Sequence, residues 1–238
     1  MSMSRDRVVF VAGATGSLGR AVASLFAAQG DRLALGGTDT DRLTSLAAEI
    51  ELADDRWVAA VGHVGTADGA AAATRAATDR FGQIDVLVHV VGGFAGGVPV
   101  AELTRDDVEP MLRQHLWTTV HLAHAIVPGM VERGWGRVVA AATVAAVTAP
   151  ARSGPYAAAK AAQEVLLRSL AKEVGGSGVT VNVVAIKAID EKHARETDPS
   201  SKNTSWTTPE EIAVTIRFLC SDEAAAINGA RIALDGRT

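Results

Sequence analysis

Short apolar runs alternate along the chain with longer segments in which apolar residues recur every three or four positions. Runs rich in β-branched residues are typical of strands buried in a parallel sheet, and the longer segments are typical of covering helices. We expect strands near residues 7–12, 32–36, 57–61, 86–90, 136–141, 179–184 and 230–234. We expect helices near residues 16–29, 39–52, 67–81, 105–133, 154–173 and 209–220. This alternation predicts an α/β fold with a doubly wound, mainly parallel seven-stranded sheet and helices on both faces.

One stretch, residues 190–208, is polar and follows neither period. Its length and position are typical of a loop over a ligand site, so we expect a substrate loop there. No repeat, proline-rich linker or change of composition divides the rest of the chain, so we expect residues 1–238 to form a single domain.

The composition narrows the class of protein. The chain has 238 residues, 48% of them hydrophobic, which is enough for a sizeable core. A formal net charge of -4 gives no broad basic field, so we expect a small-molecule substrate and no nucleic acid. The apolar runs fall short of the roughly 20 residues that span a bilayer, so we expect no membrane segment. Cys220 is the only cysteine and the first strand begins too early for a signal peptide, which predicts a cytoplasmic protein.

The first strand runs into a glycine turn and then a helix, in "VVFVAGATGSLGRAVA". Gly13, Gly16 and Gly19 allow the backbone to turn sharply and approach a pyrophosphate, toward which the helix N-terminus directs its amide hydrogens. This order of elements predicts a Rossmann-type dinucleotide site. The alternative, a structural turn, would need fewer glycines.

The end of the second strand bears on the choice between NAD and NADP. An acidic residue there binds the ribose 2′-hydroxyl and repels a 2′-phosphate. This chain has Gly37 and Thr38 at that point, with Asp39 one position later, which favours NADP. No arginine stands at the expected place, so NAD remains open. Arg20 is a candidate phosphate ligand, and an ordinary helix-surface position is the alternative.

The only tyrosine of the chain, Tyr156, precedes Lys160 by four positions in an alanine-rich segment. On a helix the two side chains lie one turn apart on the same face. An ammonium group at that distance stabilises a phenolate and makes the phenol a better proton donor. An exposed tyrosine packed on a lysine stem would have the same spacing, so the context has to decide.

That context resembles the classical short-chain dehydrogenase/reductase family over nearly the whole length. The glycine segment is similar to the family's N-terminal motif, with Ser17 in place of its middle glycine. The segment "IDVLVHVVGG" resembles a strand that ends in Asn-Asn-Ala-Gly, and residues 208–236 resemble the C-terminal helix and strand. The resemblance implies an NAD(P)H-dependent oxidoreductase that transfers hydride between nicotinamide and a carbonyl or imine of a small substrate.

The resemblance also implies roles for individual residues. Tyr156 corresponds to the catalytic acid/base, Lys160 to its electrostatic partner and Thr143 to the serine that polarises the substrate oxygen. His115 corresponds to an asparagine that holds a water, with a packed helix residue as the alternative, and Ser153 is a weaker hydroxyl candidate. The implied cofactor-binding residues are Gly13, Thr15, Gly16, Ser17, Leu18, Gly19, Gly37, Thr38, His63, Val64, Val91, Gly92, Gly93, Tyr156, Lys160 and Ile189.

Several positions depart from the family's pattern. His63 replaces the aspartate of an adenine-binding Asp-Val, His89 replaces the first asparagine, and Ile186 and Lys187 replace a Pro-Gly pair. These departures motivate an alternative hypothesis, a dinucleotide-binding protein of the same fold with little or no catalysis.

Two further expectations concern substrate and assembly. A branch related to dihydropteridine reductases is matched at Ile189, Asp190, Arg195, Trp206 and Pro209. A flat cyclic substrate would find aromatic contacts at Phe94, Trp117 and Trp206. The family resemblance implies a homodimer or homotetramer built through the long fourth helix and the helix of Tyr156. His121 and His124 share no clear face with His115, so we expect no metal site.

Overall fold

One seven-stranded sheet organises the computed structural model, which describes residues 6–235. Its strands are β1 (Val8–Ala12), β2 (Arg32–Gly37), β3 (Trp57–Val61), β4 (Val86–His89), β5 (Gly136–Thr143), β6 (Val179–Ile186) and β7 (Arg231–Leu234). The order across the sheet is β3-β2-β1-β4-β5-β6-β7, and every neighbouring pair is parallel. The order reverses between β1 and β4, and such a reversal leaves a crevice at the carboxyl ends of the strands. The predicted doubly wound α/β fold is confirmed.

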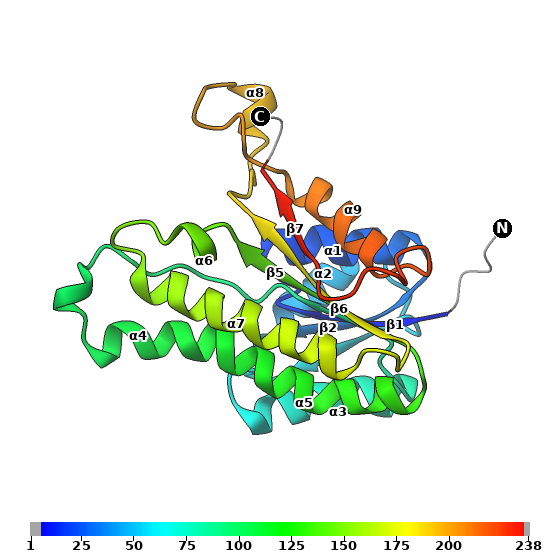
Figure 1. Ribbon diagram of the computed structural model, residues 1–238. Helices are drawn as coiled ribbons and strands as arrows, with labels where there is room; N and C mark the ends of the chain where they lie inside the picture. Colours follow the sequence, from blue (N-terminus) through cyan, green and yellow to red (C-terminus); the bar gives the residue numbers. More distant parts are fainter. Residues whose placement is uncertain (1–5, 236–238) are drawn as a thin grey trace.

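Helices cover both faces of the sheet. They are α1 (Ser17–Ala28), α2 (Thr40–Glu49), α3 (Ala67–Phe81), α4 (Arg105–Met111), α5 (Thr118–Glu132), α6 (Ala145–Thr148), α7 (Gly154–Glu173), α8 (Ala194–Thr197) and α9 (Pro209–Leu219), with a 3-10 turn, η1 (Val100–Glu102). Figure 1 shows α1 and α9 on one face, and α3, α5 and α7 on the other. None of the helices within residues 6–235 combines the length and apolar character that a bilayer crossing requires.

Each face of the sheet buries its own apolar cluster, because side chains alternate along a strand. On β1, Phe10 packs with Leu122 and Ile126 of α5, whereas Val9 and Val11 belong to the cluster of Phe26 on α1. All five residues of β1 are buried, as expected of a central parallel strand.

The segment predicted as one helix over residues 105–133 is divided in three. A π-helical segment, η2 (Leu112–Trp117), separates α4 from α5. Pro110 lies just before it and cannot donate a backbone hydrogen bond, which weakens the regular helix there. Within η2, His115 is fully buried while Trp117 is 45% exposed. Such π-turns are frequent at functional sites.

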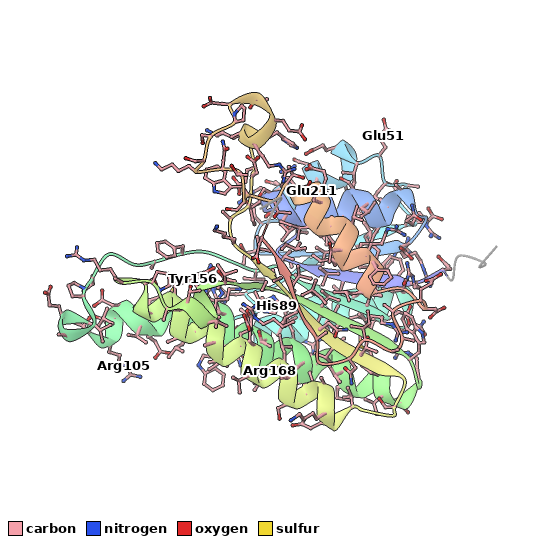
Figure 2. All side chains as sticks on the ribbon, turned by 45° about the horizontal axis from the view of Figure 1, so that its top comes forward. Glu51, His89, Arg105, Tyr156, Arg168 and Glu211 are labelled. Atoms are coloured by element: carbon pink, nitrogen blue, oxygen red, sulfur yellow. The ribbon has the colours of Figure 1, made fainter. Side chains whose placement is uncertain are left out.

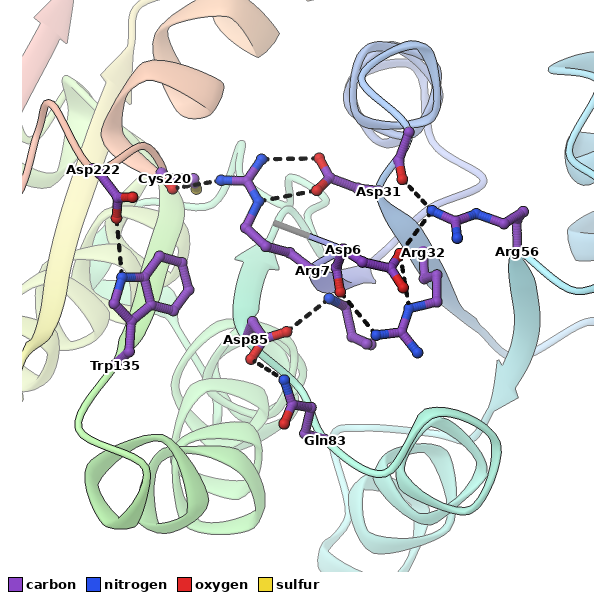
Figure 3. Close-up of polar contacts among 12 residues, drawn as sticks. Asp6, Arg7, Asp31, Arg32, Arg56, Gln83, Asp85, Trp135, Cys220 and Asp222 are labelled. Atoms are coloured by element: carbon purple, nitrogen blue, oxygen red, sulfur yellow. Dashed lines mark hydrogen bonds and ion pairs between the residues drawn. The ribbon is translucent and has the colours of Figure 1, made fainter. Parts of the chain in front are cut away.

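Charged side chains fasten the opposite edge of the sheet, where the strands begin. Figure 3 shows Arg7 in a two-pronged contact with Asp31, with both N–O distances 2.9 Å. Arg7 also donates to the carbonyl oxygen of Cys220 at 3.0 Å. This network joins β1 and β2 to the end of α9 and lies away from the carboxyl edge.

β5 and β6 each extend two residues beyond their predicted ends, and two short helices were not predicted. β5 continues to Thr143 and β6 to Ile186, where these two residues are paired. α6 follows β5 directly, and α8 lies within the expected substrate loop. Figure 1 shows α8 beyond the carboxyl ends of β6 and β7.

Candidate active site

The carboxyl ends of the strands border a cleft of about 660 Å³. Its walls come from the glycine turn after β1, the loop after β4, the end of β5, helix α7 and the segment after β6. Predicted site residues that line it are Gly13, Thr15, Gly16, Ser17, Leu18, Gly19, Val91, Gly92, Gly93, Thr143, Tyr156, Lys160 and Ile189. A second hollow of about 420 Å³ shares the glycine turn and is lined by Gly37, Thr38, His63 and Val64.

The glycine turn fits the pyrophosphate of a dinucleotide. Gly13 has a φ of +90°, which favours glycine, and a Cβ on Gly19 would lie 2.1 Å from the carbonyl oxygen of Gly13. Helix α1 begins after Gly16 with no side-chain cap and no acidic residue in its first turn, as far as the described residues show. The first amides of α1 therefore face the cleft as donors for an anion.

A carboxylate already occupies the edge of this anion site. The Ser17 hydroxyl donates to Oε1 of Glu191 at 2.6 Å. Glu191 comes from the segment after β6 and also lines the cleft. This contact could not be predicted from the sequence, because its two residues lie 174 positions apart.

Two arginines at these hollows were not among the predicted site residues: Arg113, which lines the second hollow, and Arg42. Arg42 lines the cleft, near the helix N-terminus that Asp39 caps by accepting from the Arg42 amide at 3.1 Å. Arg20, the candidate phosphate ligand, forms an ion pair with Glu49, as its alternative of an ordinary helix-surface position would allow. Arg42 is therefore better placed than Arg20 for a ribose phosphate.

Tyr156 lies near the start of α7, where Pro155 occupies the first turn. Its ring makes edge contacts with Phe94, at 5.2 Å between centroids, and with His115, at 5.4 Å. Burial raises the pKa of the Tyr156 phenol, and the Thr143 hydroxyl acts in the opposite direction. The ring is thus held by two neighbours and still faces the cleft.

Lys160 follows one helical turn later and is 4% exposed. Its Nζ donates to the carbonyl oxygen of Ala141 at 2.9 Å and to Oε1 of Gln163 at 3.0 Å. Burial lowers the pKa of Lys160 to about 8, and Glu164 opposes this shift. An ammonium has three hydrogens, so one is left for a ligand in the cleft.

Thr143 ends β5 and is held in place by backbone contacts. Its Oγ1 accepts from the Ala145 amide at 3.2 Å, which leaves the hydroxyl hydrogen to donate. Ser153, the weaker candidate, is buried and donates to the carbonyl oxygen of Pro150 at 2.5 Å. The hydroxyl of Thr143 therefore suits a substrate oxygen better than that of Ser153.

His115 lies behind the cleft wall and does not line either hollow. Its Nε2 donates to the carbonyl oxygen of Gly93 at 3.1 Å, so the ring anchors the loop after β4. Burial lowers the pKa of His115 to about 3, and Lys160 adds to this shift. The imidazole is neutral at pH 7.

Other candidates have structural surroundings. His121 stacks on Trp117 at 5.8 Å between centroids, and His124 is exposed. No group of potential metal ligands gathers anywhere within residues 6–235. In the expected substrate loop, Asp190 accepts from the amides of Ala194 and Arg195, which stabilises α8. Trp206 accepts from the Arg195 guanidinium through its carbonyl oxygen and does not line the cleft.

Comparison with known proteins identifies the family of the chain. Residues 13–236 match the family described as enoyl-(acyl carrier protein) reductase. D-threitol dehydrogenase of Mycolicibacterium smegmatis is 33% identical over 97% of this chain and 92% of its own. The 3-oxoacyl-(acyl-carrier-protein) reductase of Vibrio cholerae is 30% identical over 97% of this chain and 96% of its own. L-sorbose reductase from Gluconobacter frateurii, solved with NADPH and L-sorbose, has a TM-score of 0.86 at 25% identity, covering 97% of this chain and 95% of that one.

A doubly wound sheet with a glycine turn suited to an anion, and with a tyrosine one turn from a lysine, is typical of dinucleotide-dependent oxidoreductases. The chain belongs to the short-chain dehydrogenase/reductase family. It is an NAD(P)-dependent enzyme that acts on carbonyl or hydroxyl groups, as its named relatives are. The alternative of a binding protein without catalysis is not favoured, and the resemblance to the dihydropteridine reductase branch stays a prediction.

Proposed function

We propose that Tyr156, Lys160 and Thr143 form the catalytic group for interconversion of a small carbonyl compound and its alcohol. The observation that carries this proposal is that all three line one cleft together with the glycine turn. The nicotinamide dinucleotide, when bound, supplies or accepts the hydride at the substrate carbon. Tyr156 Oη gives the proton to the substrate oxygen during reduction, and the Thr143 hydroxyl donates a hydrogen bond to that same oxygen.

The charge of Lys160 makes Tyr156 a better acid. A phenol with a pKa near 10 is a weak donor at neutral pH, and burial raises the pKa of Tyr156 further. The Lys160 ammonium one turn away favours the phenolate and so opposes that shift during proton transfer. Its remaining hydrogen is suited to a ribose hydroxyl of the dinucleotide.

NADPH is the cofactor we propose, in preference to NADH. Thr38, which lines the second hollow, takes the place of an acidic residue after β2, and Arg42 supplies a cation that lines the cleft. The structural relative from Gluconobacter frateurii was solved with NADPH. Together these features favour a ribose that carries a 2′-phosphate.

A small cyclic carbonyl compound fits the substrate side of the cleft. Phe94 is 68% exposed and its ring contacts Tyr156, so it offers an aromatic edge beside the reacting group. Residues 190–208 would cover the substrate from the other side. A panel of cyclic and linear ketones with matched carbon number would test this preference.

Exposed apolar side chains support assembly into a homodimer or homotetramer. Trp117 on η2 is 45% exposed and Val165 on α7 is 56% exposed. We propose a cytoplasmic location, which suits the buried and unpaired thiol of Cys220. Light scattering at micromolar concentration tests the assembly, and a monomer would contradict it.

The Tyr156→Phe variant tests the catalytic proposal. We expect the turnover number for every accepted ketone to fall by a factor of about 100 to 10,000, the usual contribution of a positioned proton donor. The dissociation constant for NADPH should stay within about twofold, because the ring and its contacts remain. Turnover at the wild-type rate would refute the role of Tyr156.

A further inference from the structure

Beneath the catalytic lysine lies a buried chain of polar side chains in an otherwise apolar layer. His89 and Thr119 are each 2% exposed, Gln163 is 1% exposed and Lys160 is 4% exposed. They come from β4, α5 and α7, and Figure 2 shows His89 in the interior of the molecule. Buried polar groups cost free energy unless they are hydrogen-bonded, so such a chain calls for an explanation.

The surroundings of these buried polar side chains determine which groups donate and which accept. The Thr119 hydroxyl donates to the carbonyl oxygen of His115 at 2.8 Å, which leaves two lone pairs. Nε2 of Gln163 donates to one of them at 2.9 Å, and Nε2 of His89 lies 3.0 Å from the same oxygen. Within the described residues, Nδ1 of His89 is buried without a hydrogen-bond partner, so the tautomer with its hydrogen on Nε2, donating to the threonine hydroxyls, is the one that leaves no ring N–H unpaired.

This direction fixes the amide of Gln163. With its NH₂ group on Thr119, the carbonyl oxygen Oε1 points at Nζ of Lys160, 3.0 Å away. A flipped amide would bring its NH₂ group against the ammonium, donor against donor. Gln163 therefore offers Lys160 a fixed neutral acceptor.

We propose that Gln163 is a positioning residue, oriented by Thr119 and His89, that holds the Lys160 ammonium charged and directed at the reacting tyrosine. This assignment rests on the proposed catalytic role of Tyr156 and Lys160. The Ala141 carbonyl is the only other acceptor that the described residues give to Nζ. Loss of Gln163 therefore removes one of two groups that compensate for burial of the charge.

No carboxylate takes over this role. On α7 itself, Tyr156 and Glu164 are the ionisable neighbours of Lys160, and Glu164 forms an ion pair with Arg231 at 2.9 Å. From β4 and η2 come His89 and His115, and burial lowers the pKa of each to about 3. Both histidines are neutral at pH 7. Glu164 raises the pKa of Lys160 without touching Nζ, so the acceptors in hydrogen-bond contact with the ammonium are the neutral Gln163 and Ala141 groups.

Two substitutions of Gln163 that should shift the titration midpoint of Lys160 in opposite directions test the proposal. Gln163→Leu removes the acceptor, so the midpoint for titration of Lys160 should fall by about one unit. Gln163→Glu places a carboxylate at the same distance, so the midpoint should rise by about one unit. A residue that only filled space would not move the midpoint in opposite directions.

The titration can be read without any substrate. The chain has only five lysines, so their ¹³Cε signals are resolvable by NMR, and Lys160→Arg identifies the one that disappears. We expect the wild-type signal to titrate near 8, in keeping with the lowered pKa of Lys160. Unshifted midpoints in both Gln163 variants would overturn the proposal.

The two adjacent threonines provide a matched control. Both contact Nε2 of His89, but only Thr119 accepts from Gln163. Thr119→Val should lower the titration midpoint of Lys160. Thr119→Ser keeps the hydroxyl and should have the wild-type midpoint, as should Thr118→Val. Equal shifts of the Lys160 midpoint in Thr118→Val and Thr119→Val would refute the proposal that Thr119 orients Gln163. The same variants remain informative if a Gln163 variant fails to fold.

Failure of this inference and failure of the proposed function are distinguishable. If the midpoints shift as expected but no ketone is reduced by the wild-type enzyme, the positioning role stands and the catalytic proposal falls. If Tyr156→Phe abolishes turnover but the Lys160 midpoint is unchanged in both Gln163 variants, the catalytic proposal stands and the positioning role of Gln163 falls. In an active enzyme the alkaline limb of kcat should move with the NMR midpoint in both Gln163 variants.

Discussion

Replacement of Lys160 by methionine removes a charge from the interior and should change how stability depends on pH. Burial lowers the pKa of Lys160 from 10.5 to about 8. Between these values the unfolded chain binds a proton at this site and the folded chain does not. The free energy of unfolding of the wild type therefore gains a contribution that rises with pH across this window.

The size of the effect follows from the shift and from the partners that the variant leaves behind. The difference between the two pKa values corresponds to about 3 kcal/mol that the charged lysine costs the folded protein at pH 7. Methionine removes this cost but leaves the Ala141 carbonyl and Gln163 Oε1 without a donor, which costs about 1 kcal/mol for each acceptor. Lys160→Met should thus be more stable than wild type by about 1 to 2 kcal/mol at pH 7, and less stable by a similar amount above pH 10.5.

Urea unfolding of both proteins from pH 7 to pH 10.5, at one protein concentration, measures this difference directly. Taking the difference cancels other groups that titrate in the range, such as Cys220, whose pKa burial raises to about 12. The two stability curves should cross at about pH 9. A difference that stays constant with pH would refute the reasoning, because it would mean that Lys160 titrates alike in the folded and unfolded chains.

Three other outcomes test the cofactor site. Glu191→Gln removes a negative charge beside the proposed pyrophosphate position, so NADPH should bind about fivefold more tightly in calorimetry at low salt. The gain should be smaller at high salt, because salt screens the charge. The control variant Glu196→Gln, on the same segment, should not change NADPH binding. Arg42→Ala should weaken NADPH binding about tenfold and leave NADH binding nearly unchanged, and equal losses for both would contradict the phosphate role. Gly19→Ala should lower the free energy of unfolding by about 3 kcal/mol, because its Cβ would lie 2.1 Å from a backbone oxygen. In the control variant Gly16→Ala the nearest atom to the new Cβ is 3.6 Å away, so the midpoint of thermal unfolding should stay close to that of the wild type.

Much of the fold could be predicted because its signals are local. Each strand is a short apolar run and each major helix has its own period, so the seven strands and their parallel pairing follow from the alternation. The glycine turn is also local, since strand, turn and helix are contiguous. The π segment within residues 105–133 escaped prediction, because a helix keeps its apolar period when one turn widens.

The site was predictable only in part, for the same reason. Tyr156 and Lys160 are one turn apart, so their spacing is visible in the sequence. Gln163 gave no signal, because its partner Thr119 is 44 positions away and both sit in ordinary helical patterns. Glu191 lies 174 positions from Ser17, and only the return of the chain over the carboxyl edge brings them together. Contacts between distant segments need the topology before they can be inferred.

The polar chain beneath Lys160 also explains why its acceptors are neutral. A carboxylate in contact with Nζ would keep the lysine protonated, but it would cancel most of the field that the ammonium exerts on the Tyr156 phenol. An amide and a backbone carbonyl satisfy the hydrogens of the ammonium without supplying a counter-charge. Glu164, the nearest carboxylate on α7, is tied to Arg231 instead. The charged form of Lys160 is thus less stable than it would be beside a carboxylate, but its positive charge acts on the proton donor. Active sites commonly lose stability in favour of function in this way.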